Sequence, residues 1–264
     1  MDKIQDLIPH YSDGAVKLTA EEKLQLQCDA ENAVKGKMTL IDCPVCNNKG
    51  FVSVVKDNEI VTQECECMQR RLFIERLSAN GLDEQAKVKK FNNYEVTMPF
   101  QADLQKMVYT YATTDTDQWL YIGGQRGCGK THLCIAAAVK LTKKHNVQYF
   151  VWEDNSEDLT GGSFSGEAER RKKIELIKTA QVLYIDDFLR KPKPEPREIR
   201  LAFEIINYRY NKNLRTIITS EKTLAELYSS VDSAIAGRIA EMCGDFKYSV
   251  NEDPKKDYRI HGGK

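Results

Sequence analysis

One stretch of this 264-residue chain restricts its possible folds more than any other. Residues 124–131 read Gly-Gln-Arg-Gly-Cys-Gly-Lys-Thr and follow the apolar run Trp119–Gly123. They fit the pattern G-x-x-x-x-G-K-[ST], a glycine-rich loop between a strand and a helix. Glycines permit a tight turn whose backbone N–H groups converge on a phosphate, and the helix that follows adds the positive end of its dipole. We therefore predict a nucleoside triphosphate site at this phosphate loop.

The positions of the phosphate loop predict different contacts with the nucleotide. We expect Lys130 to reach the β- and γ-phosphates and the Thr131 hydroxyl to bind Mg²⁺. A glycine-rich turn that binds nothing is the alternative, and the strand and helix around the loop argue against it. The other residues expected to hold the nucleotide are Gly124, Gly127, Cys128, Gly129 and His132.

A second apolar run, Val182–Ile185, ends in the two carboxylates Asp186 and Asp187. Four consecutive apolar residues are typical of a strand inside a parallel sheet, whose carboxyl edge carries the binding site. We expect Asp186 to hold Mg²⁺ through water, and Asp187 to orient or deprotonate the attacking water. Alone, such a pair is more often an ordinary strand end, but here it follows the phosphate loop by about 55 residues, with one strand between them.

Apolar runs that alternate with helical patterns predict an α/β fold in which helices flank a parallel sheet. The strand expected at 214–220 would place Thr219, Ser220 or Glu221 between the phosphate site and the attacking water. Further strands are expected at 147–152 and 246–250.

The balance of charge limits the arguments available for a nucleic-acid partner. Lysine plus arginine and aspartate plus glutamate both total 39, so any attraction to nucleic acid must come from local patches. Residues 68–90 are basic, and form either a solvated connector or a nucleic-acid contact. No apolar run approaches the roughly 18 residues of a membrane span, and residues 1–6 do not resemble a signal peptide. We expect a cytoplasmic protein without a membrane partner.

Four of the eight cysteines are confined to residues 43–67. They form a Cys-x-x-Cys pair and a Cys-x-Cys pair on either side of a predicted hairpin, which is how a zinc ribbon arranges four thiolates. The tighter second spacing weakens this match, and unliganded thiols or redox chemistry is the alternative. Four protein ligands would make Zn²⁺ structural rather than catalytic. The expected ligands are Cys43, Cys46, Cys65 and Cys67.

The residues before the cysteines carry helical patterns. Ile4, Leu7 and Ile8 mark a short amphipathic stretch, and Thr19 with Glu22 forms a capping box for a second helix. This region is either a packing element or a helix that docks a partner. The expected domains are a helical and zinc-binding domain at 1–80, a linker at 81–100 and a nucleotide-binding domain at 101–264.

The order of these motifs resembles a known family. The phosphate loop, the strand ending Ile185-Asp186-Asp187, the strand Ile217–Ser220 and the segment Ala236–Gly244 follow one another as in the AAA+ ATPase core of DnaC/DnaI-type replicative helicase loaders. The resemblance covers roughly residues 90–250. The cysteine module is similar to the zinc-binding front end of DnaI-type loaders.

This resemblance implies an AAA+ P-loop fold and a slow ATPase stimulated by DNA or a partner. Lys130 and Thr131 match the Walker A residues, and Asp186 and Asp187 the Walker B pair. Arg238 matches the arginine finger, which would act on a neighbouring subunit's nucleotide. Without the family resemblance, Arg238 would be interpreted as an ordinary surface arginine of a helix. The implied cofactors are ATP, Mg²⁺ and Zn²⁺. The implied partners are a hexameric replicative helicase held by residues 1–80, single-stranded DNA, and further copies of the AAA+ domain.

One position departs from the family pattern. These loaders commonly have Ser-Asn where this chain has Ser220-Glu221, and a carboxylate that pointed inward would repel the γ-phosphate. We expect Ser220 to make the catalytic contact; otherwise Glu221 turns away or nucleotide sensing is weakened. Arg259 is the only candidate in reach for a sensor-2 arginine.

Two other functions remain open on these residues. One is an IstB-like ATPase that helps a DNA transposase, although such helpers usually lack the cysteine module. The other is a zinc-dependent adaptor that binds nucleotide as a switch with little turnover, which Glu221 would explain. The basic residues expected to contact DNA are Lys172, Lys173, Arg190, Lys191 and Lys193.

Overall fold

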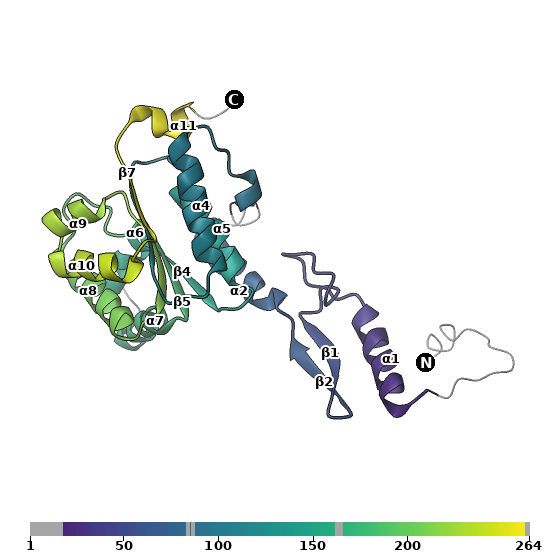
Figure 1. Ribbon diagram of the computed structural model, residues 1–264. Helices are drawn as coiled ribbons and strands as arrows, with labels where there is room; N and C mark the ends of the chain where they lie inside the picture. Colours follow the sequence, from purple (N-terminus) through teal and green to yellow (C-terminus); the bar gives the residue numbers. More distant parts are fainter. Residues whose placement is uncertain (1–17, 83–84, 86–87, 162–165, 262–264) are drawn as a thin grey trace. The chain divides into compact units, whose positions relative to one another are not determined.

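The computed structural model describes residues 18–82, 85, 88–161 and 166–261 (Figure 1). The chain divides into two compact units, the first ending at Met68 and the second beginning at Gln69. The domain boundaries expected at residues 80 and 100 stay predictions. Residues 69–78 of helix α2 (Cys67–Ser78) belong to the second unit, where the ring of Phe73 meets that of Tyr149 edge-on at 6.4 Å. The amphipathic stretch expected at Ile4–Ile8 lies outside the described residues.

The first unit combines a helix with a two-stranded hairpin. Helix α1 (Ala20–Ala33) begins with the predicted capping box, in which the Glu22 N–H donates to the Thr19 hydroxyl and the Thr19 N–H donates to the Glu22 carboxylate. Strands β1 (Phe51–Lys56) and β2 (Glu59–Glu64) pair antiparallel across a two-residue turn. Asp57 and Asn58 both have positive φ there, as a tight hairpin turn requires.

A five-stranded sheet forms the centre of the second unit. Its order is β4-β5-β6-β3-β7, and every neighbouring pair is parallel. The predicted fold class is therefore confirmed. Because all strands run the same way, their carboxyl ends meet at one edge of the sheet. The bounds are β3 (Leu120–Gly124), β4 (Val147–Val151), β5 (Val182–Asp186), β6 (Arg215–Thr219) and β7 (Lys247–Val250).

Helices cover both faces of this sheet (Figure 1). Helices α4 (Pro99–Thr113) and α5 (Lys130–Leu141) pack together on one face. On the other face α8 (Pro196–Asn211) contacts α6 (Trp152–Thr160), α7 (Glu167–Thr179) and α10 (Ser233–Cys243). The remaining short elements are the turns η2 (Phe91–Asn93) and η3 (Pro254–Lys256) and the helices α9 (Leu224–Ser230) and α11 (Tyr258–His261).

A buried arginine ties one of these helix layers to the sheet. Arg209 of α8 has no exposed surface, and its guanidinium donates to the carbonyls of Lys178 and Ala180 after α7 at 3.0 and 2.8 Å. It also donates to the carbonyl of Arg215 and the hydroxyl of Thr216 on β6. The bonds to Lys178, in the last turn of α7, and to its C-cap Ala180 satisfy carbonyls that the helix end leaves without helical partners. No helix within the described ranges is long and apolar enough to cross a membrane.

Candidate nucleotide-binding and metal sites

The phosphate loop follows β3 and leads into α5, as predicted. Gly124 and Gly129 adopt positive φ values of 95° and 93°, where a side chain would be strained. Space forbids one as well: a Cβ on Gly124 would lie 2.1 Å from the Val250 carbonyl oxygen, and one on Gly129 would lie 2.7 Å from the Tyr94 ring. Both the backbone and its neighbours therefore require glycine.

Lys130 lies folded over the phosphate loop. Lys130 is buried, and Nζ donates to the carbonyl oxygens of Gly124 and Gln125, both at 2.7 Å. The ammonium group thus sits among backbone groups that a phosphate could replace as partners. This position fits the predicted contact with the nucleotide phosphates.

Asp186 ends β5 as a buried carboxylate with three hydroxyl neighbours. It accepts hydrogen bonds from Thr219, from Thr131 at 3.3 Å and from Tyr149 at 3.0 Å. Burial and the charge of Asp186 raise the pKa of Tyr149, so its hydroxyl stays a donor. The structure therefore brings together the Thr131 hydroxyl and the Asp186 carboxylate, the two groups predicted to hold Mg²⁺.

Asp187 turns away from the strand at a positive φ of 55°, and its N–H donates to the Thr219 hydroxyl at 3.2 Å. Its carboxylate lies 3.6 Å from the Arg190 guanidinium. Burial and the neighbouring Asp186 raise the pKa of Asp187 above its ordinary value. A carboxylate with a raised pKa at this position is suited to accept a proton from water.

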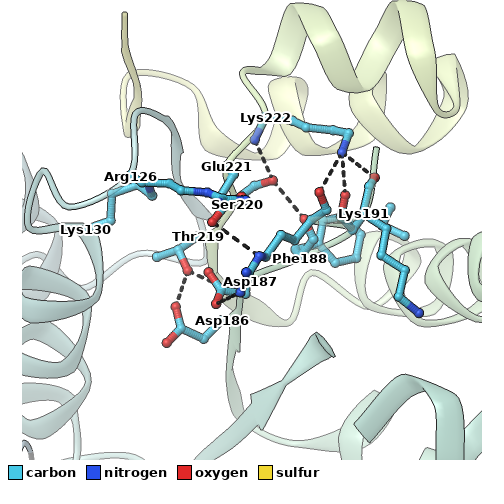
Figure 2. Close-up of polar contacts among 12 residues, drawn as sticks. Arg126, Lys130, Asp186, Asp187, Phe188, Lys191, Thr219, Ser220, Glu221 and Lys222 are labelled. Carbon is cyan, nitrogen blue, oxygen red and sulfur yellow. Dashed lines mark hydrogen bonds and ion pairs between the residues drawn. The ribbon is translucent and has the colours of Figure 1, made fainter. Parts of the chain in front are cut away.

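Ser220, which we expected to contact the nucleotide, is hydrogen-bonded within the protein (Figure 2). It is fully buried, donates to the Phe188 carbonyl at 2.8 Å and accepts from the Lys222 N–H at 3.0 Å. It is not among the residues that line the nucleotide cavity described below. Its neighbour Thr219 joins Asp186 to Asp187 through two hydrogen bonds.

Four charged side chains form a chain of ion pairs next to the phosphate loop. Arg126 Nη2 lies 2.5 Å from Glu221 Oε2, and Arg190 Nε lies 3.3 Å from Glu221 Oε1. Arg190 then continues to Asp187. Glu221 therefore does not turn away from the site. Arg126 was not among the predicted site residues, although it stands inside the phosphate loop and an unexpected carboxylate follows β6.

A cavity of about 470 Å³ opens beside these groups. Its walls come from the phosphate loop, from residues that follow β5 and β6, and from two segments distant in sequence, within residues 88–101 and at residues 258–259. Its charged and aromatic lining includes Lys89, Tyr94, Arg126, Lys130, His132, Asp187, Arg190, Glu221, Tyr258 and Arg259. The volume and the mixture of basic and aromatic groups suit a nucleotide.

Two segments far from the phosphate loop in sequence are held against it, one around Tyr94 and the other at Tyr258. In the first, the Lys90 carbonyl lies 3.0 Å from the His132 ring, and the Tyr94 ring meets the His132 ring edge-on at 5.2 Å. In the second, the Tyr258 N–H donates to the Gly127 carbonyl at 3.0 Å. Arg259, the candidate sensor-2 arginine, follows directly and lines the cavity.

Arg238 does not line the nucleotide cavity of its own chain. On α10 its guanidinium lies 5.1 Å from the Phe203 ring and 5.6 Å from the Tyr210 ring, and it donates to the Ala234 carbonyl at 3.0 Å. Both rings belong to α8. The side chain is thus held on the face that α8 and α10 form together.

The four predicted cysteine ligands lie together in the first unit. Their sulfur atoms are all within 4.8 Å of one another, and three of the residues are buried. Burial opposes ionisation of Cys46, but the Gly50 N–H and the neighbouring thiols outweigh it and lower the pKa of Cys46 to about 6. A thiolate forms readily there, and four sulfurs at this spacing suit a tetrahedral Zn²⁺ site.

The parallel sheet, the phosphate loop and the acidic strand end define the second unit as a P-loop ATP-binding protein. A family model described as "IstB-like ATP binding protein" matches residues 23–242. The chain belongs to this family.

Two curated relatives come from Bacillus subtilis (strain 168). The uncharacterized protein YqaM is 28% identical over 211 residues, which are 73% of this chain and 64% of YqaM, so the chain spans less than two thirds of that relative. The phage-like element PBSX protein XkdC is 28% identical over 236 residues, 82% of this chain and 85% of XkdC.

Solved structures share the fold. The DnaC helicase loader matches with a TM-score of 0.51 at 20% identity, over 62% of this chain and 97% of that one. DnaI matches with a TM-score of 0.51 at 20% identity, over 66% and 92%. The replication initiator DnaA bound to AMPPCP and single-stranded DNA matches with a TM-score of 0.52 at 21% identity, over 65% and 52%. The predicted DnaC-like AAA+ fold is confirmed.

Proposed function

We propose that this protein is an ATPase that loads a hexameric replicative helicase onto single-stranded DNA in the cytoplasm. The observation that carries the proposal is the nucleotide site of the second unit, built on a fold that extends over more than nine tenths of the DnaC and DnaI chains. The cysteine cluster of the first unit supports it, because the sequence resemblance links such a module to helicase loaders.

The described side chains divide the work of ATP hydrolysis among them. Lys130 would exchange its carbonyl partners for the phosphates, and Thr131 and Asp186 would hold Mg²⁺, which when bound would neutralise charge on the phosphate oxygens. Asp187 accepts the proton of the attacking water, and Thr219 holds the Asp186 carboxylate and the backbone of Asp187 in place. The nucleotide contact expected of Ser220 stays a prediction. To make it, the Ser220 hydroxyl would have to exchange the Phe188 carbonyl or the Lys222 N–H for the nucleotide.

We infer that a neighbouring subunit completes the site. Arg238 is held on the α8–α10 face by two aromatic rings, outside its own cavity, so an assembly of AAA+ domains would bring it to another chain's nucleotide. A fixed guanidinium there stabilises charge on the transferring phosphoryl group.

A mixing experiment tests this arrangement. Lys130→Ala and Arg238→Ala should each lack ATPase activity, the first without nucleotide binding and the second with it. Mixed together they should regain part of the activity, because one variant keeps an intact site and the other an intact finger. Loss of nucleotide binding in Arg238→Ala, or no activity in the mixture, would count against a finger in trans.

DNA binding rests on local basic residues. Two of the five predicted contacts are held by carboxylates: Arg190 by Asp187 and Glu221, and Lys191 by Glu157 at 2.7 Å. Lys172 and Lys193 are exposed, and we propose these two as DNA contacts. Their replacement by glutamine should weaken binding to an oligonucleotide without changing nucleotide affinity.

The family description favours one second candidate, an IstB-like ATPase that assists a transposase. Affinity capture with the full chain and ATP separates the two. Helicase loading predicts retention of a purified hexameric replicative helicase, reduced in Lys130→Ala. Retention of transposase instead would favour the alternative, and a chain that binds ATP but retains neither would favour the nucleotide-switched adaptor.

A further inference from the structure

Glu221 occupies an unusual place for a carboxylate. It lines the cavity next to the phosphate loop, and only 18% of its side chain is exposed. An uncompensated negative charge there would repel a triphosphate. Both of its oxygens are instead taken, Oε2 by Arg126 of the phosphate loop and Oε1 by Arg190 after β5.

Two guanidinium groups that converge on one carboxylate are also a typical arrangement for binding a phosphoryl group. Arg126 and Arg190 line the same cavity as Lys130. Arg126 is 61% exposed, so its side chain can change partners without disturbing packing. A terminal phosphate that entered between these arginines would compete directly with Glu221.

Hydrogen bonds hold the residues on both sides of Glu221 to the segment after β5 (Figure 2). Lys222 Nζ donates to the carbonyls of Leu189, Arg190 and Lys191 at 2.9, 3.1 and 2.6 Å. The Phe188 N–H donates to the Thr219 carbonyl at 2.8 Å. These bonds fasten the segment that carries Arg190 to the end of β6, so Glu221 and Arg190 stay within reach of each other in either state.

We propose that Glu221 is an internal counter-ion that competes with the γ-phosphate of ATP for Arg126 and Arg190. Without a γ-phosphate the carboxylate holds both arginines; with one, the arginines turn to the phosphate. Glu221 therefore lowers the affinity for ATP more than that for ADP, and favours the return to the paired state once the γ-phosphate has left. This inference rests on the ATP site of the proposed function, but not on the helicase.

Charge-neutral substitution tests the proposal. Nucleotide affinities of the full chain would be measured with fluorescent ADP and with a fluorescent non-hydrolysable ATP analogue, both with Mg²⁺. Glu221→Gln should tighten the ATP analogue by about three- to tenfold and ADP by less than about twofold. Glu204→Gln, which removes an exposed carboxylate paired with Lys178 outside the cavity, should change neither affinity.

A double-mutant cycle tests whether Arg126 is the group for which Glu221 and the γ-phosphate compete. Arg126→Gln should weaken binding of the ATP analogue more strongly in the Glu221→Gln background than in the unmodified chain, because in the unmodified chain part of the Arg126–phosphate interaction is offset by the lost ion pair with Glu221. Equal tightening of ADP and the analogue in Glu221→Gln, weaker binding in that variant, or additive effects of the two substitutions would each overturn the proposal. Lys130→Ala distinguishes the outcomes: if it binds both nucleotides like the unmodified chain, the ATP site itself is wrong.

Discussion

Thr219 makes hydrogen bonds to both acidic residues of the site, Asp186 and Asp187. Its hydroxyl donates to the Asp186 carboxylate and accepts from the Asp187 N–H, so one side chain orients both acids. It is fully buried, and no other hydroxyl on β6 reaches Asp186 in the described structure. The geometry of metal binding and of water activation therefore depends on the same group.

We expect Thr219→Val to keep the shape of this residue and lose both hydrogen bonds. The free energy of unfolding should fall by about 1–2 kcal/mol. ATPase activity should fall about 10- to 100-fold, because both acids lose their orientation. Urea unfolding and steady-state ATP turnover measure these effects. Thr179→Val, at the exposed end of α7, is the control, and equal losses in the two variants would show that the effect is not specific to the site.

Asp187 links stability to pH. Its pKa is raised in the folded protein above the ordinary 3.8, first by burial and then by Asp186. The folded state therefore binds this proton more tightly than the unfolded state, and the charged form costs stability as the pH rises through the raised pKa.

Asp187→Asn should consequently be more stable than the unmodified chain at pH 7. Asparagine also tolerates the positive φ found here. The advantage should shrink as the pH falls toward 3.8, where aspartic acid is neutral as well. Unfolding curves at several pH values test this, with the exposed Asp245→Asn as the control. An advantage that grew on acidification would contradict the assigned direction of the pKa shift, while ATP turnover in Asp187→Asn should be lost.

At the scale of the elements, the phosphate loop depends on contacts with segments outside it. Gly124 meets the end of β7, and Gly129 meets Tyr94 of the segment before α4. The loop is thus shaped both by its own glycines and by the chain packed around it.

A pair of glycine substitutions separates this requirement from a general effect of alanine. Gly129→Ala places a methyl group 2.7 Å from the Tyr94 ring at a positive φ, and should cost about 1–2 kcal/mol or more and abolish nucleotide binding. Gly237→Ala, within α10 and without a neighbour within 4 Å, should instead gain up to about 1 kcal/mol. Thermal unfolding and nucleotide titration report both. Nucleotide binding by Gly129→Ala would refute the steric argument.

At the scale of the whole molecule, the two units differ in the size of their apolar cores. The second has a large apolar core, with buried side chains such as Trp119, Trp152 and Phe188. The first has few buried apolar groups besides its cysteines. A unit this small needs a metal or another staple to remain folded.

Removal of Zn²⁺ should therefore affect the units unequally. We expect a strong chelator to unfold the first unit while nucleotide binding by the second survives. Metal analysis should find stoichiometric zinc in the purified chain, and Cys46→Ser should lose it. Cys28→Ala is the matched control, since it removes a buried thiol outside the cluster. If chelation left the first unit intact, the cysteines would not form a structural metal site.

Much of the fold and part of the site could be predicted from local patterns. The phosphate loop, the apolar strand ending in Asp186 and the cysteine pairs each lie in one short stretch, so composition and spacing reveal them directly. Their order along the chain then predicted the parallel sheet. These features depend on neighbours in sequence, and for that reason the sequence alone determined them.

Only the tertiary structure decided which side chains share the site. Successive residues at a strand end point in different directions, so the Thr219 hydroxyl meets the Asp186 carboxylate while the Ser220 hydroxyl meets the Phe188 carbonyl. The pairing of Glu221 with Arg126 joins segments that are distant in sequence. The same is true of the wall formed by Tyr258 and Arg259. Contacts of this kind depend on how the strands and helices pack against one another, which no local pattern encodes.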